Sequence, residues 1–168
     1  ESALFQGLIS LQILQMDSNN LVILNETLFK DLHNLERLYL HNNQLASLGD
    51  GLFQDLRNLT ELSLSANELV SLDVNLFKDL HNLEIIYLFS NQIETLGVGI
   101  FQDLHKVDTL WLALNNLVSL DANLFQGLYN LETLTLQNNQ LASLGDGVFQ
   151  DLNHLHTLWL AFNNLVSL

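Results

Sequence analysis

The sequence contains no cysteine and no proline among its 168 residues, and basic residues are scarce. Without cysteine the chain forms neither a disulfide framework nor a metal site with thiolate ligands. Five lysine and arginine residues stand against nineteen acidic ones, so the formal net charge is −14. Nucleic acids and anionic membrane surfaces carry the same sign of charge, and this balance argues against both as partners. No apolar run approaches the roughly 20 residues that a membrane-spanning helix needs, which argues against membrane insertion.

Leucine, by contrast, is abundant and recurs with a fixed period of 24 residues. The segments come into one register when seven residues are aligned: Leu11, Leu35, Leu59, Leu83, Val107, Leu131 and Leu155. Each segment follows the pattern L-x-x-L-x-L-x-x-N-x-L-x-x-L, in which Met16, Ile86, Ile93 and Val107 replace leucine, and where the period is complete an F-x-x-L motif follows at a constant offset. Self-similarity at such a period indicates a solenoid, in which every repeat stacks on the next.

The L-x-L portion of each repeat has the period of a β-strand. Leu38 and Leu40 therefore point inward, while Tyr39 between them points outward. One short strand per repeat, stacked about 4.8 Å from the next, gives a parallel sheet. A phenylalanine column is expected to stack along the return side and fill that half of the core: Phe5, Phe29, Phe53, Phe77, Phe101, Phe125 and Phe149.

These motifs resemble the leucine-rich-repeat family, in its 24-residue class with phenylalanine in the return segment. The resemblance implies an α/β repeat solenoid: a horseshoe arc with a concave parallel β-sheet and an irregular or short-helical convex side. It also implies that an asparagine column bonds to backbone groups of neighbouring turns: Asn19, Asn43, Asn67, Asn91, Asn115, Asn139 and Asn163. The repeats are similar to those of Toll-like receptors and of variable lymphocyte receptors, and this similarity favours an extracellular location.

The whole chain, 1–168, is predicted to be a single domain. It divides into a partial repeat at 1–10, full repeats at 11–34, 35–58, 59–82, 83–106, 107–130 and 131–154, and a partial repeat at 155–168. Neither end carries a polar cap, so the chain is expected either to be a piece of a larger array or to associate end to end with another copy through its termini. The apolar face expected at the last repeat comprises Leu155, Leu158, Leu160, Leu165 and Leu168.

The residues most informative about function are those that face outward on the strands, because the framework does not require them. Seven aromatic residues lie outside the phenylalanine column, and six of these fall on the predicted concave face: Tyr39, Tyr87, Phe89, Trp111, Trp159 and Phe162. Tyrosine and tryptophan dominate the centres of protein interfaces. Aromatic residues also suit strand positions for packing reasons alone. We favour a binding role, with Tyr87 and Trp111 stacked in adjacent repeats about 4.8 Å apart.

An acidic column lies on the same face and is formed by Glu36, Glu84, Asp108 and Glu132. Stacked carboxylates repel one another, so the column either attracts a basic ligand or is an ordinary solvated edge. The candidate ligand-binding set comprises the aromatic residues, three of these acidic residues and their neighbours: Arg37, Tyr39, His41, Glu84, Tyr87, Phe89, Asp108, Trp111, Leu114, Glu132, Trp159 and Phe162.

The sequence shows no nucleophile elbow, phosphate-binding loop or zinc-protease motif, and we predict neither catalysis nor a cofactor or metal. The leading hypothesis is a ligand-recognition module that binds a protein, or a glycan, on its concave face. The alternatives are the repeat segment of an intracellular sensor attached to a nucleotide-binding switch, and an engineered or trimmed array without a natural ligand. Two glycosylation sequons begin at Asn25 and Asn58, about the number that chance produces in so asparagine-rich a chain.

Overall fold

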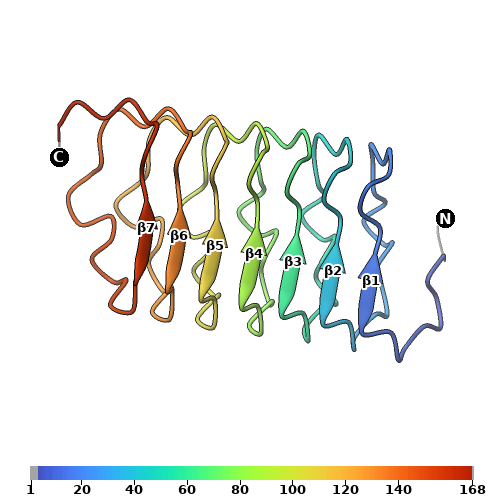
Figure 1. Ribbon diagram of the computed structural model, residues 1–168. Helices are drawn as coiled ribbons and strands as arrows, with labels where there is room; N and C mark the ends of the chain where they lie inside the picture. Colours follow the sequence, from blue (N-terminus) through green and yellow to red (C-terminus); the bar gives the residue numbers. More distant parts are fainter. Residues whose placement is uncertain (1–3, 168) are drawn as a thin grey trace.

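The computed structural model describes residues 4–167, which form one parallel sheet of seven strands in chain order. Figure 1 shows the strands side by side along one face of a coil, with the connecting segments behind and around them. The strands are β1 (Ile13–Gln15), β2 (Arg37–Tyr39), β3 (Glu61–Ser63), β4 (Ile85–Tyr87), β5 (Thr109–Trp111), β6 (Thr133–Thr135) and β7 (Thr157–Trp159). Leu168, expected on a terminal apolar face, lies outside the described residues.

The register of the sheet equals the repeat of the sequence. Leu38 pairs with Leu62, Leu62 with Ile86, and Ile86 with Leu110, so that every strand residue faces its equivalent in the next repeat. Those four central side chains are fully buried. The predicted solenoid with a parallel sheet on one face is therefore confirmed.

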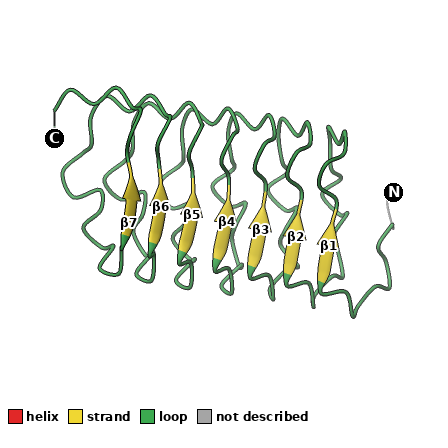
Figure 2. Cartoon of the chain, viewed as in Figure 1, coloured by secondary structure: helices red, strands yellow, loops and turns green. Residues whose placement is uncertain are grey.

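The return side of the coil is irregular. Its backbone bonds run from an amide to the carbonyl three residues earlier, as from Leu28 to Asn25 (2.9 Å) and from Leu32 to Phe29 (3.2 Å). Asp31 and Asp79 have φ angles of 71° and 68°, which interrupt a right-handed helix at each such point. Residues 4–167 contain turns and no helix on this side, so the short-helical form of the expectation is not found (Figure 2). Nor does this part of the chain hold a helix of the length and hydrophobicity that crossing a membrane requires.

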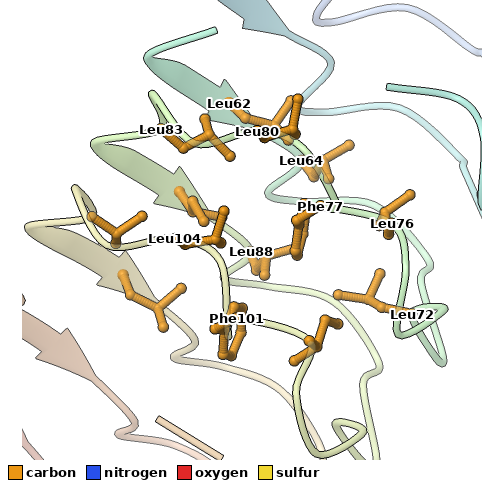
Figure 3. Close-up of a cluster of buried hydrophobic side chains, with 14 of the residues drawn as sticks. Leu62, Leu64, Leu72, Leu76, Phe77, Leu80, Leu83, Leu88, Phe101 and Leu104 are labelled. Carbon is orange, nitrogen blue, oxygen red and sulfur yellow. The ribbon is translucent and has the colours of Figure 1, made fainter. Parts of the chain in front are cut away.

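The phenylalanine column forms a stack inside the return half of the coil, as predicted. Phe77 and Phe101 are at most 1% exposed, and their ring centroids lie 6.1 Å apart with nearly parallel planes. Leucines from the strands and from the return segments pack around them (Figure 3). Aromatic rings of this size carry a large share of the buried apolar area, so the column is a main contribution to stability.

The asparagine column forms the expected ladder between repeats. The side-chain nitrogen of Asn91 donates to the carbonyls of Leu64 (3.0 Å) and Leu88 (3.1 Å), while its oxygen accepts the amide of Leu69 (3.1 Å). This one side chain thereby satisfies backbone groups of its own repeat and of the repeat before it. The same bonds recur at the other central members, which are 5–8% exposed: Asn43, Asn67, Asn115 and Asn139.

A second ladder, which the sequence analysis did not identify, joins the return turns. Asn34, Asn58, Asn82 and Asn130 each donate a side-chain amide to a carbonyl 25 residues earlier, at distances of 2.7–2.9 Å. The amide nitrogen of Asn58, the first residue of a sequon, is thus engaged with the carbonyl of His33. The two ladders thus connect neighbouring repeats at two places, one in the turn after the strand and one in the return segment.

Candidate functional site

The concave face consists of the outward side chains of the seven strands and of the turn that follows each strand. In β2, Arg37 is exposed and Tyr39 half-buried on either side of the fully buried Leu38. The in-register pairing of the strands places equivalent residues in columns across the sheet, while the burial of the outward residues differs from strand to strand. Columns matter here because residues 24 positions apart in sequence become direct neighbours, about 4.8 Å apart.

Three aromatic side chains meet at β4 and β5, and we call Tyr87, Phe89 and Trp111 the aromatic cluster. Tyr87 pairs with Trp111 across the two strands, with ring centroids 5.0 Å apart and planes at 73°. The ring centroid of Phe89 lies 5.7 Å from that of Trp111 and 6.4 Å from that of Tyr87. Tyr87 therefore meets both other rings edge to face, an arrangement that the ring quadrupole favours, rather than in the parallel stack expected from the spacing, and Phe89 and Trp111 are tilted at 55° to each other.

Two strands interrupt the aromatic column with a small, recessed residue. Ser63 of β3 lies between Tyr39 and Tyr87, and Thr135 of β6 lies between Trp111 and Trp159. Ser63 and Thr135 are each 4% exposed. The flanking tryptophans are 37% and 55% exposed and so rise beside the recessed threonine.

The two recessed positions differ in their hydrogen bonding. The hydroxyl of Ser63 lies 3.3 Å from the hydroxyl of Ser65, and the two form a hydrogen bond with each other. On β6, by contrast, the Oγ1 atom of Thr135 and the Oε1 atom of Gln137 are buried and have no partner. This difference was not predicted from the sequence, because aromatic and charged residues, and not the small residues between them, marked the face there.

Two large apolar residues border the recess at Thr135. Leu114 and Phe162 follow β5 and β7 in the turn and are 50% and 79% exposed. Their φ angles of 56° and 57° lie in the left-handed region, which is costly for bulky side chains. The repeats on either side of β6 thus each present a tryptophan and a second exposed apolar side chain.

The N-terminal part of the concave face carries mixed charges. The rings of Tyr39 and His41 meet edge to face at 6.2 Å, and Nε2 of His41 lies 3.4 Å from a carboxylate oxygen of Asp17. Burial raises the pKa of Tyr39, and the adjacent Glu61 raises it further. Arg37 extends from the same strand into solvent. This candidate subset thus lies together, two repeats away from the aromatic cluster.

The C-terminal part of the face is acidic. Glu84 and Glu132 are exposed at the starts of β4 and β6, and the half-buried Asp108 between them accepts a hydrogen bond from the Thr109 hydroxyl at 2.7 Å. Burial, followed by the negative charges of Glu61 and Asp108, raises the pKa of Tyr87. The sequence places no lysine or arginine at the outward strand positions after Arg37. A cation approaching this part of the face therefore meets only attractive fixed charge.

Other candidate sites are weaker. Residues 4–167 contain no group of three histidine, aspartate or glutamate side chains arranged to hold a metal ion. A hollow on the return side is lined by Glu26, Asp50, Lys78, Asp79 and neighbouring polar residues. Its lining is polar and solvated, and no aromatic side chain contributes to it. The aromatic cluster thus lies on the concave face and not at this hollow.

Comparisons with known proteins agree with the geometry. A family model described as leucine rich repeat matches residues 1–45, 34–93, 57–113 and 85–141. A second, described as leucine rich repeats (2 copies), matches residues 129–168. No curated protein matches the sequence.

Two solved structures share the fold over almost the whole chain. One is the Toll–Spatzle complex of Drosophila, with a TM-score of 0.91 and 30% identity over 95% of this chain and 21% of that chain. The other is the TLR13–ssRNA13 complex, with a TM-score of 0.90 and 31% identity over 99% of this chain and 23% of that chain. The present chain therefore spans less than a quarter of the length of either neighbour.

Proposed function

The chain belongs to the leucine-rich-repeat family, and we propose that it is a non-catalytic recognition module that binds a protein partner on its concave face. The aromatic cluster of Tyr87, Phe89 and Trp111 carries the proposal. The framework does not need these side chains, since serine, threonine and glutamine occupy the same columns in other repeats. Three rings in mutual contact on a partly exposed surface form a rigid apolar anchor of the kind that dominates binding energy.

The remaining candidate residues surround this anchor in the manner of a rim. Trp159 provides a second aromatic contact beyond β6, and charged side chains lie at the strand starts. A polar, solvated border around a central aromatic group is the usual anatomy of a protein interface. The proposed rim consists of Arg37, Tyr39, His41, Glu84, Asp108, Leu114, Glu132, Trp159 and Phe162.

The structural neighbours support a recognition role. One of them is solved with the protein Spatzle and the other with single-stranded RNA. For the present chain a protein is the better candidate, because its net charge of −14 opposes the phosphate backbone of a nucleic acid.

The test is a selection of binders from a display library of folded protein domains, followed by affinity measurement on variants. In the double variant Tyr87→Ala/Trp111→Ala we expect at least about a tenfold loss of affinity for most selected domains, since central aromatic side chains act as hot spots. Tyr129→Ala is the matched control, because Tyr129 is 49% exposed but lies on the return side.

Far-UV circular dichroism and thermal unfolding establish that each variant folds. The proposal would be overturned if the selected domains bound the double variant as tightly as the native protein. Loss of binding in Tyr129→Ala alone would have the same consequence, because it would place the interface on the return side.

A further inference from the structure

The recess at β6 is bounded by two tryptophans at matched positions. Trp111, Thr135 and Trp159 are direct cross-strand neighbours, and we call these three residues with Gln137 the β6 site. With strands about 4.8 Å apart, the backbones that carry the two tryptophans are separated by roughly 9–10 Å. A flat group in van der Waals contact with a ring on each side needs about 7 Å between the ring planes. The spacing of the backbones at Trp111 and Trp159 exceeds this thickness.

The floor of the β6 site carries two polar atoms without partners, Thr135 Oγ1 and Gln137 Oε1. Gln137 Oε1 is an acceptor only, and a hydroxyl oxygen also accepts. Buried polar atoms are almost always paired, and an unpaired one points to a group supplied from outside. At the equivalent position of β3, the hydroxyls of Ser63 and Ser65 satisfy each other. One further buried polar atom of the described residues has no partner, Nδ1 of His41, at the position equivalent to Gln137 in the second repeat. At β6 two such atoms lie in one repeat, and both can accept hydrogen bonds from a ligand.

The fixed charge around the β6 site is negative. Glu84, Asp108 and Glu132 lie in consecutive repeats at the starts of β4, β5 and β6. Tryptophan is also the side chain whose ring face attracts cations most strongly. The two buried acceptors, the two tryptophan rings and the surrounding carboxylates all favour a ligand that is both a hydrogen-bond donor and a cation.

We propose that the β6 site binds an arginine side chain presented by the protein partner. The guanidinium group is planar, always charged, and offers five N–H donors and no acceptor, and it stacks readily on aromatic rings. The proposal rests on the proposed function, because it assigns one residue type of the partner to one position on the concave face. A lysine fits less well, since its ammonium group is compact and strongly hydrated and does not stack between rings.

Binding requires a small movement of the walls. The two floor atoms are covered in the free molecule, so a side chain beside them must move before a ligand reaches them. Trp159, which is 55% exposed, has the space to do so. Trp111 and Trp159 are also the two tryptophans of the whole chain. Intrinsic tryptophan fluorescence therefore reports directly on the β6 site.

The experiment is a fluorescence titration of the protein at constant ionic strength with the capped peptide acetyl-Gly-Arg-Gly-amide. Two matched probes replace the arginine, one with citrulline, which is neutral and nearly the same shape, and one with lysine. We expect a saturable signal with the arginine peptide and affinities at least about tenfold weaker with the other two, because either change removes stacking, charge or donors. Equal affinity for the lysine or citrulline peptide would overturn the arginine assignment.

Variants locate the binding. Thr135→Val/Gln137→Leu removes both floor acceptors at nearly constant volume and is expected to weaken the arginine peptide about tenfold. The double variant should unfold at the same temperature as the native protein or higher, since it also removes two unpaired buried polar atoms. Ser63→Ala, at the equivalent position of β3, is the control and should leave the affinity unchanged. Equal losses in both variants would overturn the proposal.

The outcomes separate this inference from the proposed function. If the arginine peptide does not bind, while the selected domains still depend on Tyr87 and Trp111, the arginine assignment is wrong and the recognition surface stands. If the selected domains do not depend on those two residues, the proposed function is wrong whatever the peptide does.

Discussion

Replacing Asn91 by alanine tests whether the asparagine ladder holds the repeats together. The side chain makes three bonds with buried backbone groups, and it is itself 8% exposed. After truncation the carbonyls of Leu64 and Leu88 each keep one partner, because Asn67 and Asn115 also donate to them. The amide of Leu69, by contrast, has no second acceptor within the coil.

The expected loss of stability depends on which backbone groups lose their only hydrogen-bond partner. A buried amide left without any partner costs about 1–3 kcal/mol, and each weakened carbonyl adds about 0.5–1 kcal/mol. Asn91→Ala should therefore lower the free energy of unfolding by roughly 3 kcal/mol. Asn19→Ala is the matched control, since Asn19 is exposed and its amide bonds only to Met16 and Asp17 of its own turn. Water replaces those bonds, so its cost should stay within about 0.5 kcal/mol.

Urea unfolding followed by far-UV circular dichroism and tryptophan fluorescence measures both variants. If the two probes give the same transition, unfolding is two-state and the difference in midpoint multiplied by the slope gives the change in stability. A loss for Asn91→Ala within about 1 kcal/mol of that for Asn19→Ala would refute the reasoning, because it would mean that the ladder bonds are worth no more than exposed ones.

Three further predictions use the same unfolding assay or a titration. Phe101→Ala, in the buried stack, should cost roughly 3–5 kcal/mol, whereas Phe162→Ala, at a side chain that is 79% exposed, should stay within about 0.5 kcal/mol. The pKa of the Tyr87 phenol lies above its ordinary value of 10.0. The raised pKa of Tyr87 therefore contributes stability that is complete below pH 10 and is lost as the pH rises through the folded-state pKa. An ultraviolet absorbance titration that compares Tyr87→Phe with the native protein detects the ionisation of this phenol. Leu114→Asn should raise stability by up to about 1 kcal/mol, because asparagine tolerates the left-handed backbone conformation better than leucine.

The sequence was sufficient to predict features that repeat without exception. Leu38 and its equivalents occupy the same offset in all seven segments, and so do Phe101 and Asn91 in their columns. Each of these side chains performs the same task in the central repeats, so one assignment of the pattern applies to all of them. The sheet, the aromatic stack and the buried ladder follow from this regularity.

Features that depend on how a side chain is oriented were not predictable in this way. The second ladder was not predicted, because Asn58 shares its column with Lys106 and His154 and the column therefore has no constant residue type. The edge-to-face contact of Tyr87 with Trp111 depends on side-chain rotamers, about which a 24-residue spacing carries no information. Whether the hydroxyl of Thr135 is buried and unpaired likewise depends on the orientation of the side chains around it.

The turn that follows each strand offers an independent argument that the β6 site is a functional feature. One position of this turn has φ between 50° and 57° in all seven repeats, and serine, asparagine or alanine fills it in five of them. Leucine and phenylalanine fill it only at Leu114 and Phe162, in the two repeats that flank β6. A bulky residue in this conformation costs about 1 kcal/mol or more. Because both side chains remain at least half exposed, burial in the core returns little of that cost. A contact made outside the chain is the compensation that remains, and the proposed arginine-binding site lies in the repeat between those of Leu114 and Phe162.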